Sequence, residues 1–368
     1  MKSANPALRG ETILYDAKAV YCTSLFYLKG ETMDADLKKM KTGKPDGTAA
    51  GLSPFPYSDT NKRYHTYSYH LKKAYGHKLA KIPLDAGFTC PNRDGTRGYG
   101  GCAFCSSRGS GDTILHSGED LRMQFEAGLE RARQKWPDAD GIAYFQSYSN
   151  TYAPLPVLQQ VLGPVFAWED AAEVSIATRP DCLDGDKIRW LAEMNRIKPV
   201  WVELGLQSAK DSTMVRMNRG HGTACLAACM KQLAGSGIRT CLHIINGLPG
   251  ESREDMLDTA RFVAGMHPDA VKIHMLHVIS DSALGQSYLK APFPLLSMED
   301  YVQIVCNQLE LLPGEMVVER ITGDGVAENL LAPLWTAKKR VTMNAVDREL
   351  ARRGSWQGKL YAGEDGGD

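Results

Sequence analysis

Short apolar segments with β-strand character alternate with helical segments through the middle of this 368-residue chain. The apolar segments span residues 81–87, 141–146, 173–178, 201–207, 240–246 and 270–275, and helical segments span residues 118–136, 154–167, 185–196, 223–235 and 251–266. Such alternation is typical of βαβ units that build a parallel sheet. Right-handed crossovers curl a sheet of this kind into a barrel. Because six units are visible where a complete barrel has eight, we predict an α/β fold with a partial (β/α)6 TIM-like barrel.

Regions of different character flank the repeating units. Residues 1–57 mix Lys, Gly, Pro, Ser and Asp with weak periodicity, and we interpret them as a poorly ordered or atypical N-terminal extension. The barrel is assigned to residues 58–296. A mostly helical C-terminal extension follows at 297–361, with helices expected over 297–312 and 329–353, and residues 362–368 form an acidic tail.

The composition excludes several classes of protein. Hydrophobic residues make up 43% of the chain, charged residues make up 23%, and the formal net charge is zero, so the chain as a whole indicates no polyanionic partner. No apolar run approaches the ~18 residues of a membrane span, and the N-terminus lacks the apolar core of a secretory signal. We therefore expect a cytoplasmic protein whose nine cysteines are thiols or metal ligands.

Three cysteines directly after the first predicted strand form the pattern C-x11-C-x2-C: Cys90, Cys102 and Cys105. The residues between them are rich in Gly, Asn, Asp and Arg, which favours a loop that wraps an object. Four thiolates would fill a cubane iron–sulfur cluster and restrict it to electron transfer, whereas three leave one iron open. S-adenosylmethionine (SAM) can chelate that iron, and one electron then cleaves it to a 5′-deoxyadenosyl radical, so that the cofactors supply the chemistry.

A structural zinc site is the alternative interpretation of these cysteines. Zinc takes four ligands, usually as two close pairs, and this sequence offers one C-x2-C pair with His116 as the nearest later candidate. The other cysteines are interpreted as unliganded thiols, which is a common state of buried cysteine: Cys22, Cys182, Cys225, Cys229, Cys241 and Cys306.

Several sequence blocks follow in order between about residues 54 and 361: KRYHTYSYHL, PNRDGTRGYGGCAFC, YFQSYSNTYAP, SIATRPDCL, WVELGLQS, NRGH, HIINGLPGE, VKIHMLHV and LLAPLW. In these blocks the chain resembles the YhcC/YtqA type of radical SAM protein, which is related to the radical SAM domain of the elongator catalytic subunit. The resemblance implies a partial barrel, a [4Fe-4S] cluster and SAM. It also implies tRNA as the substrate, with processing of the side chain on a modified wobble uridine, and a one-electron donor such as flavodoxin or ferredoxin.

Polar residues at the ends of the strands predict the SAM site, because a barrel of parallel strands places its site at their C-terminal ends. Arg179 suits a forked contact with the methionine carboxylate, although an ion pair with Asp181 or Asp184 is the alternative. A carboxylate in an apolar strand is costly without partners, which favours a site role for Glu203. The candidate SAM residues are Gln146, Ser147, Ser175, Thr178, Arg179, Glu203, Gln207 and Gly247.

The sixth predicted strand supplies three candidate substrate residues: Lys272, His274 and His277. Lys272 and His274 lie two positions apart and share one face of the strand. A purely structural role is the alternative for each histidine.

The segment 61–81 contains six basic residues and four tyrosines but no acidic residue. Basic groups neutralise phosphates and aromatic rings stack on unpaired bases, so the segment predicts RNA binding. The candidates are Arg63, Tyr67, Lys72, Lys73 and Lys78, and a solvated helix face is the alternative. A second basic cluster comprises residues 338–340 with Arg352 and Arg353.

The leading interpretation is therefore a radical SAM enzyme that acts on tRNA. One alternative is a radical SAM enzyme that acts on a small metabolite or peptide. Another is a non-catalytic nucleic-acid-binding protein with a zinc-stapled loop. The oligomeric state is not predicted.

Overall fold

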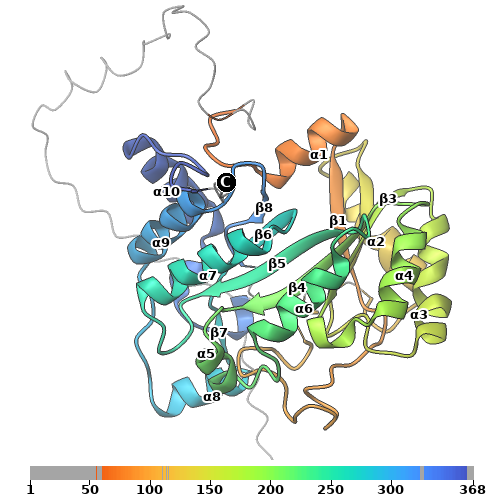
Figure 1. Ribbon diagram of the computed structural model, residues 1–368, viewed down its shortest axis with the longest axis horizontal. Coiled ribbons are helices and arrows are strands. Elements are labelled where there is room, and N and C mark those ends of the chain that lie inside the picture. Colours follow the sequence, from red (N-terminus) through yellow and green to blue (C-terminus); the bar gives the residue numbers. More distant parts are fainter. Residues whose placement is uncertain are drawn as a thin grey trace, which may run out of the picture. The chain divides into compact units, whose positions relative to one another are not determined.

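A curved sheet of seven parallel strands dominates the computed structural model, which describes residues 55, 60–109, 111–112, 114, 116–323 and 327–362. The strands follow one another in the order β1-β2-β3-β4-β5-β6-β8 (Figure 1). Their bounds are Leu79–Leu84 (β1), Asp140–Phe145 (β2), Ala171–Thr178 (β3), Val200–Gln207 (β4), Arg239–Asn246 (β5), Ala270–Met275 (β6) and Val317–Arg320 (β8). The predicted partial barrel is confirmed, and all six predicted strands lie in it within two or three residues of the expected bounds.

The seventh strand, β8, comes from the C-terminal region, whose other sequence signals are mostly helical. β8 pairs with β6 in parallel, and Val318 also bridges to Thr66 just before the first helix. A short antiparallel pair, β7 (Val278–Ile279) with β9 (Leu330–Ala332), lies outside the main sheet.

Most of the helices cover the outer face of the sheet, while α1, α5 and α8 lie near the ends of its strands (Figure 1). Their bounds are Tyr67–Tyr75 (α1), Leu121–Arg133 (α2), Leu155–Leu162 (α3), Gly185–Met194 (α4), Asp211–Arg216 (α5), Thr223–Leu233 (α6), Arg253–Met266 (α7), Ala283–Lys290 (α8), Met298–Leu311 (α9) and Lys339–Arg352 (α10). Local signals explain where several of them begin. Ser252 and Asp255, for example, form a capping box that satisfies free backbone N–H groups at the start of α7.

Successive side chains along each strand point to opposite faces of the sheet, so the hydrophobic core has an outer part and an inner part. Side chains that point outward, such as Val174, Val202 and Leu242, pack under the helices in the main hydrophobic cluster. Side chains that point into the barrel at the N-terminal ends of the strands form a smaller apolar layer of Trp201, Cys241, Ala270 and Val317, against which Tyr67 of α1 packs. Burial of both faces explains why β4 is buried over seven of its eight residues.

The described residues belong to one compact unit. The predicted N-terminal extension, apart from Phe55, lies outside the described residues, as does the acidic tail beyond residue 362. None of the helices in the described part of the chain is long and apolar enough to span a bilayer.

Candidate functional site

A pocket opens at the C-terminal ends of the strands, and its cavity volume is about 250 Å³. Gln146 follows β2, while Thr178 and Gln207 end β3 and β4, so the barrel brings these separate strand ends to one place. Ten of the candidate cluster, SAM and substrate residues line the pocket: Cys90, Cys102, Cys105, Gln146, Thr178, Arg179, Glu203, Gln207, His274 and His277. The pocket is therefore the candidate active site.

Four other candidates lie beside the pocket and not on its wall. The Ser175 hydroxyl and the Lys272 ammonium both donate to Glu203 beneath the pocket floor. Ser147 is buried, and its hydroxyl has no hydrogen-bond partner among the described residues. Gly247 packs against Leu296 and Leu276 with a φ of 90°, a conformation that favours glycine.

Backbone contacts pin the loop that carries the three cysteines. The N–H of Gly101 donates to the Asn92 carbonyl, and the N–H of Ala103 donates to the Met217 carbonyl. The Asn218 side chain donates to the carbonyls of Tyr99 and Gly101 at 3.0 and 2.8 Å. Gly101 has a φ of 78°, which an L side chain rarely adopts. Met217 and Asn218, which follow α5, thus fix the position of the cysteine loop.

The surroundings of Cys102 suit an anionic sulfur. The thiol is 4% exposed, and an Nη1 of Arg219 and the Nδ2 of Asn92 lie 3.5 and 3.7 Å from its sulfur. A hydrogen bond with Cys105 and the charge of Arg219 hold the pKa of Cys102 well below its usual value, although burial opposes this. Three thiols in one pocket fit the ligand set of a [4Fe-4S] cluster. The N–H donors at the Cys102 sulfur also fit, because hydrogen bonds to the sulfurs help to set the reduction potential of such a cluster.

The described residues include no group of three or more His, Cys, Asp and Glu side chains that could hold a single metal ion. His116, the alternative fourth zinc ligand, instead contacts Glu119 on the surface at 3.3 Å. Among the six other cysteines, Cys22 lies outside the described residues, and the five remaining thiols are free.

Arg179 has the ion-pair partner that the sequence offered as an alternative. Its Nε and Nη2 donate to the two carboxylate oxygens of Asp181 at 2.9 and 2.8 Å, and its Nη1 donates to the carbonyl of Arg219. The side chain is 2% exposed, and it also lines the pocket. Arg179 thus positions Arg219 behind the cysteine loop.

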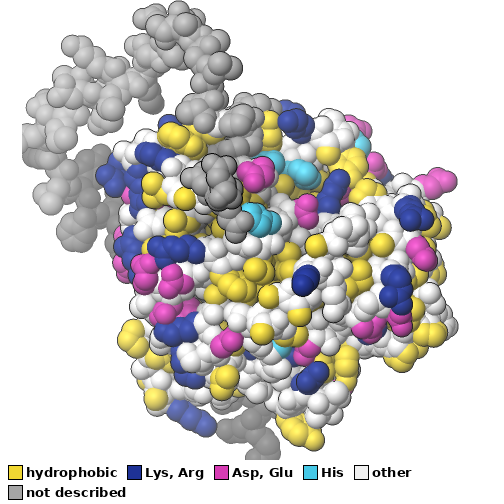
Figure 2. All heavy atoms as spheres, in the orientation of Figure 1, with side chains coloured by type: hydrophobic (Ala, Val, Ile, Leu, Met, Phe, Trp, Pro, Cys, Tyr) yellow, Lys and Arg dark blue, Asp and Glu magenta, His cyan; other side chains and the backbone are white. Residues whose placement is uncertain are grey.

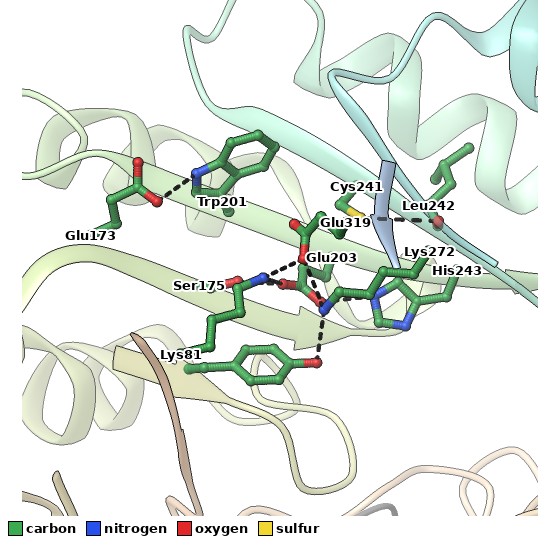
Figure 3. A network of polar contacts seen from close by, with 11 residues as sticks. Lys81, Glu173, Ser175, Trp201, Glu203, Cys241, Leu242, His243, Lys272 and Glu319 are labelled. Carbon is green, nitrogen blue, oxygen red and sulfur yellow. Dashed lines mark hydrogen bonds and ion pairs between the residues drawn. The ribbon is translucent and has the colours of Figure 1, made fainter. Parts of the chain in front are cut away.

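A buried layer of charged side chains forms the floor of the pocket, between the cavity and the apolar layer of Trp201 (Figure 3). Glu203 of β4 accepts hydrogen bonds from Lys81 of β1, Ser175 of β3, His243 of β5 and Lys272 of β6. Glu319 of β8 pairs with both lysines. Burial by itself raises the pKa of Glu203, but Lys272 and Lys81 together hold it well below its usual value.

Two histidines, His243 and His274, lie on the pocket side of this charged layer. His243 contacts Glu203 through Nε2 at 2.7 Å, and its ring centroid lies 5.3 Å from that of His274. Burial lowers the pKa of both imidazoles, which favours their neutral forms. The Nε2 of His274 is buried without a partner among the described residues, and both rings line the pocket. The floor therefore offers neutral hydrogen-bonding groups to a bound molecule.

No sequence pattern singled out Arg219, His243 or Asn92 as site residues. Each lies inside a block that carries the family resemblance, namely NRGH, HIINGLPGE and PNRDGTRGYGGCAFC. Their roles depend on contacts between distant segments, which spacing along the chain does not reveal.

Comparisons with known proteins agree with this architecture. The Radical SAM superfamily pattern matches residues 90–263, and the Radical_SAM C-terminal domain pattern matches residues 268–352. The uncharacterized protein YtqA of Bacillus subtilis is 48% identical over 309 residues, which cover 84% of this chain and 96% of that protein. The chain belongs to the radical SAM superfamily. The expected resemblance to the YhcC/YtqA type is thereby confirmed.

Two archaeal proteins show more distant similarity to this radical SAM chain. A tRNA uridine(34) acetyltransferase of Methanocaldococcus infernus is 26% identical over 154 residues, which cover 40% of this chain and 28% of that protein. The structure of Methanocaldococcus infernus Elp3 with an N-terminal deletion superimposes with a TM-score of 0.58 at 16% identity, over 76% of this chain and 64% of that one. The latter similarity supports the fold alone.

The predicted RNA-binding residues of this radical SAM protein do not share one environment. Lys72 and Lys73 are exposed in the last turn of α1. Arg63 donates to the Ser355 carbonyl, and the Tyr67 hydroxyl is buried, with its ring against Trp201. Lys78 is half-buried over the ring of Trp136. Lys78 and Tyr67 line a groove beside β1, whereas Lys72 and Lys73 do not line it.

Gly205→Ala is expected to lower the rate of 5′-deoxyadenosine formation about tenfold. A Cβ at residue 205 would lie 2.5 Å from Nη2 of Arg219 and 2.6 Å from Nε2 of Gln207, so these two pocket side chains would have to shift. The rate is measured on protein reconstituted with iron and sulfide. Gly265→Ala is the control, because its added Cβ would meet no atom within 4 Å apart from its neighbours and the backbone of its own helix. Equal rates for the two variants would contradict a role for Arg219.

Proposed function

We propose that this radical SAM enzyme holds a [4Fe-4S] cluster on Cys90, Cys102 and Cys105 and acts on tRNA. The observation that supports the cluster most strongly is the convergence of the three thiols on one pocket at the strand ends, with the Arg219 guanidinium at one of them. When bound, such a cluster supplies an electron that cleaves SAM and so generates a 5′-deoxyadenosyl radical.

The residues of the pocket then have distinct proposed tasks. Gln146, Thr178, Glu203 and Gln207 line the wall and would contact SAM. Arg179 also lines the wall and would contact SAM, while Ser147, Ser175 and Gly247 would support the wall from outside the pocket. His274 and His277 would face the substrate, while Lys272 holds the Glu203 carboxylate. A flavodoxin or ferredoxin would supply the electron.

The proposal of tRNA as substrate has separate support. The Methanocaldococcus infernus relative is named for a reaction on uridine 34 of tRNA, and its similarity covers part of this chain. We therefore propose that the substrate is the side chain of a modified wobble uridine. The same proposal divides the chain into a barrel over 58–296 and a C-terminal extension over 297–361, which adds β8 to the barrel sheet. It also includes a cytoplasmic location.

Anaerobic reconstitution with iron and sulfide, followed by dithionite and SAM, tests the chemistry. We expect brown protein with about four irons per chain and formation of 5′-deoxyadenosine. Colourless protein that contains zinc and leaves SAM intact would contradict the proposal.

The substrate requires a second experiment. Total tRNA is incubated with the reconstituted enzyme, digested to nucleosides and analysed by mass spectrometry. We expect a mass change confined to a modified uridine, and the reaction without SAM is the control. Unchanged tRNA together with active SAM cleavage would favour a small metabolite or peptide as the substrate.

A further inference from the structure

A groove of about 600 Å³ runs along the open side of the barrel, between β1 and α2 on one side and β8 and the start of α10 on the other. It is lined by one carboxylate, Glu319, whose charge is already paired with Lys81 and Lys272. Six basic side chains line the same groove: Lys78, Lys81, Arg131, Lys135, Arg320 and Lys339. On a chain of zero net charge, this groove is a concentrated cationic surface.

The cations near the mouth of the groove gather around one exposed aromatic ring. The Nζ atoms of Lys78 and Lys135 lie 4.8 and 4.5 Å from the ring centroid of Trp136, whose side chain is 38% exposed. Within the described ranges of the chain, neither lysine nor Arg131 has a carboxylate within ion-pair distance. Two cations beside one ring repel each other, and an anion placed between them relieves that repulsion.

Some basic side chains elsewhere on the surface have acidic partners. Arg353 pairs with Glu349 and Glu310, Arg352 pairs with Glu349, and basic and acidic side chains lie next to one another over α9 and α10 at the left of Figure 2. The second basic cluster of the sequence is therefore partly neutralised. Lys78, Arg131 and Lys135 have no acidic partner within the described part of the chain, and all three line the same groove.

The groove adjoins the active-site pocket. Arg320 lines both the groove and the pocket. The charged layer lies between them, since Glu203 faces the pocket while Lys81 and Glu319 face the groove. A strand that binds in the groove would therefore lie next to the active-site pocket at Arg320.

We propose that this groove binds a single-stranded segment of RNA. Lys78, Arg131 and Lys135 contact its phosphates, and a base stacks on Trp136, since cations along a strand and an exposed aromatic ring are the usual elements of such sites. The N-terminal residues 1–54 are a poorer occupant, because they carry eight Lys and Arg against six Asp and Glu and so do not complement the charge. The inference rests on the proposed function for its substrate, but RNA binding itself requires no cluster.

Charge reversal tests the groove. The full chain is titrated into a fluorescein-labelled single-stranded RNA, and anisotropy gives the affinity at several salt concentrations. The double variant Lys78→Glu/Lys135→Glu is expected to bind at least about tenfold more weakly at low salt, with a salt slope shallower by about 1.4 because two phosphate contacts are lost. Lys231→Glu/Arg196→Glu is the matched control, because it makes the same charge change at two exposed side chains on and beside the outer helices α6 and α4.

Trp136→Ala tests stacking separately from charge. We expect about tenfold weaker RNA binding with an unchanged salt slope, and Trp136→Phe is expected to retain most of the affinity. The inference would be overturned if the wild type did not bind RNA. It would also be overturned if the groove and control double variants lost RNA affinity equally, or if Trp136→Ala left RNA affinity unchanged.

The same variants separate this inference from the proposed function. Formation of 5′-deoxyadenosine without RNA is expected to be unchanged by the groove substitutions, because none of them touches the pocket. If the protein cleaves SAM but the groove substitutions leave its RNA affinity unchanged, the groove inference is wrong and the proposed function is not affected. If the groove substitutions weaken RNA binding but the protein does not cleave SAM, the proposed function is wrong and the groove inference is supported.

Discussion

Cys102→Ala is expected to reduce the iron content of the reconstituted protein from about four per chain to background, and to abolish 5′-deoxyadenosine formation. Cys102 is buried at the centre of the cysteine loop, and its sulfur has the Arg219 and Asn92 contacts. With one of the three proposed ligands removed, the two remaining thiols would not retain the proposed cluster. Iron is measured by a colorimetric assay, and the nucleoside is measured by chromatography with mass detection.

Cys225→Ala is the matched control for this prediction. Cys225 is a free, partly exposed thiol on α6 that does not line the pocket. We expect this variant to keep both its iron and its activity. Far-ultraviolet circular dichroism confirms that both variants fold. Iron retained in folded Cys102→Ala protein would mean that the cluster assignment is wrong.

Glu203→Leu is expected to lower the free energy of unfolding by about 3–5 kcal/mol, the usual cost of leaving a buried charge without its partner. The carboxylate is fully buried and accepts from Lys81 and Lys272, so its removal leaves two lysines with Glu319 as their remaining acidic partner. Urea unfolding at neutral pH, monitored by fluorescence, measures the change.

A double-mutant cycle with Lys272→Met distinguishes loss of the ion pair from loss of packing. We expect Glu203→Leu/Lys272→Met to be more stable than the sum of the two single changes predicts, because the double change removes both charges. Additive losses in the cycle would contradict the pairing.

The pH dependence of the Glu203 effect has a definite sign. The folded-state pKa of Glu203 lies well below its ordinary value of 4.5. The stability that it contributes is therefore fully present above pH 4.5 and is lost as the pH falls through the depressed folded-state pKa. The difference in stability between wild type and Glu203→Leu is expected to be constant from pH 5 to 7 and to shrink only in strong acid.

The sequence by itself determined the strand–helix alternation and the cysteine loop. Both are local, since alternation requires only short-range periodicity and the C-x11-C-x2-C pattern follows one predicted strand. The end of each strand was therefore predictable, and with it the position of Gln146, Thr178 and Gln207 at one rim. β8 was missed as a strand, because four residues carry too little periodicity to separate a strand from a loop.

Only the tertiary structure decided which polar residues meet. Glu203 stood out in the sequence as a buried carboxylate, but its partners come from four other strands at separations of up to 122 residues. Arg219 reaches Cys102 across 117 residues. The unpaired cations at Trp136 are Lys78, which directly precedes β1, and Lys135, which follows α2. Contacts of this kind depend on barrel curvature and strand register, which the pattern along a single segment does not contain.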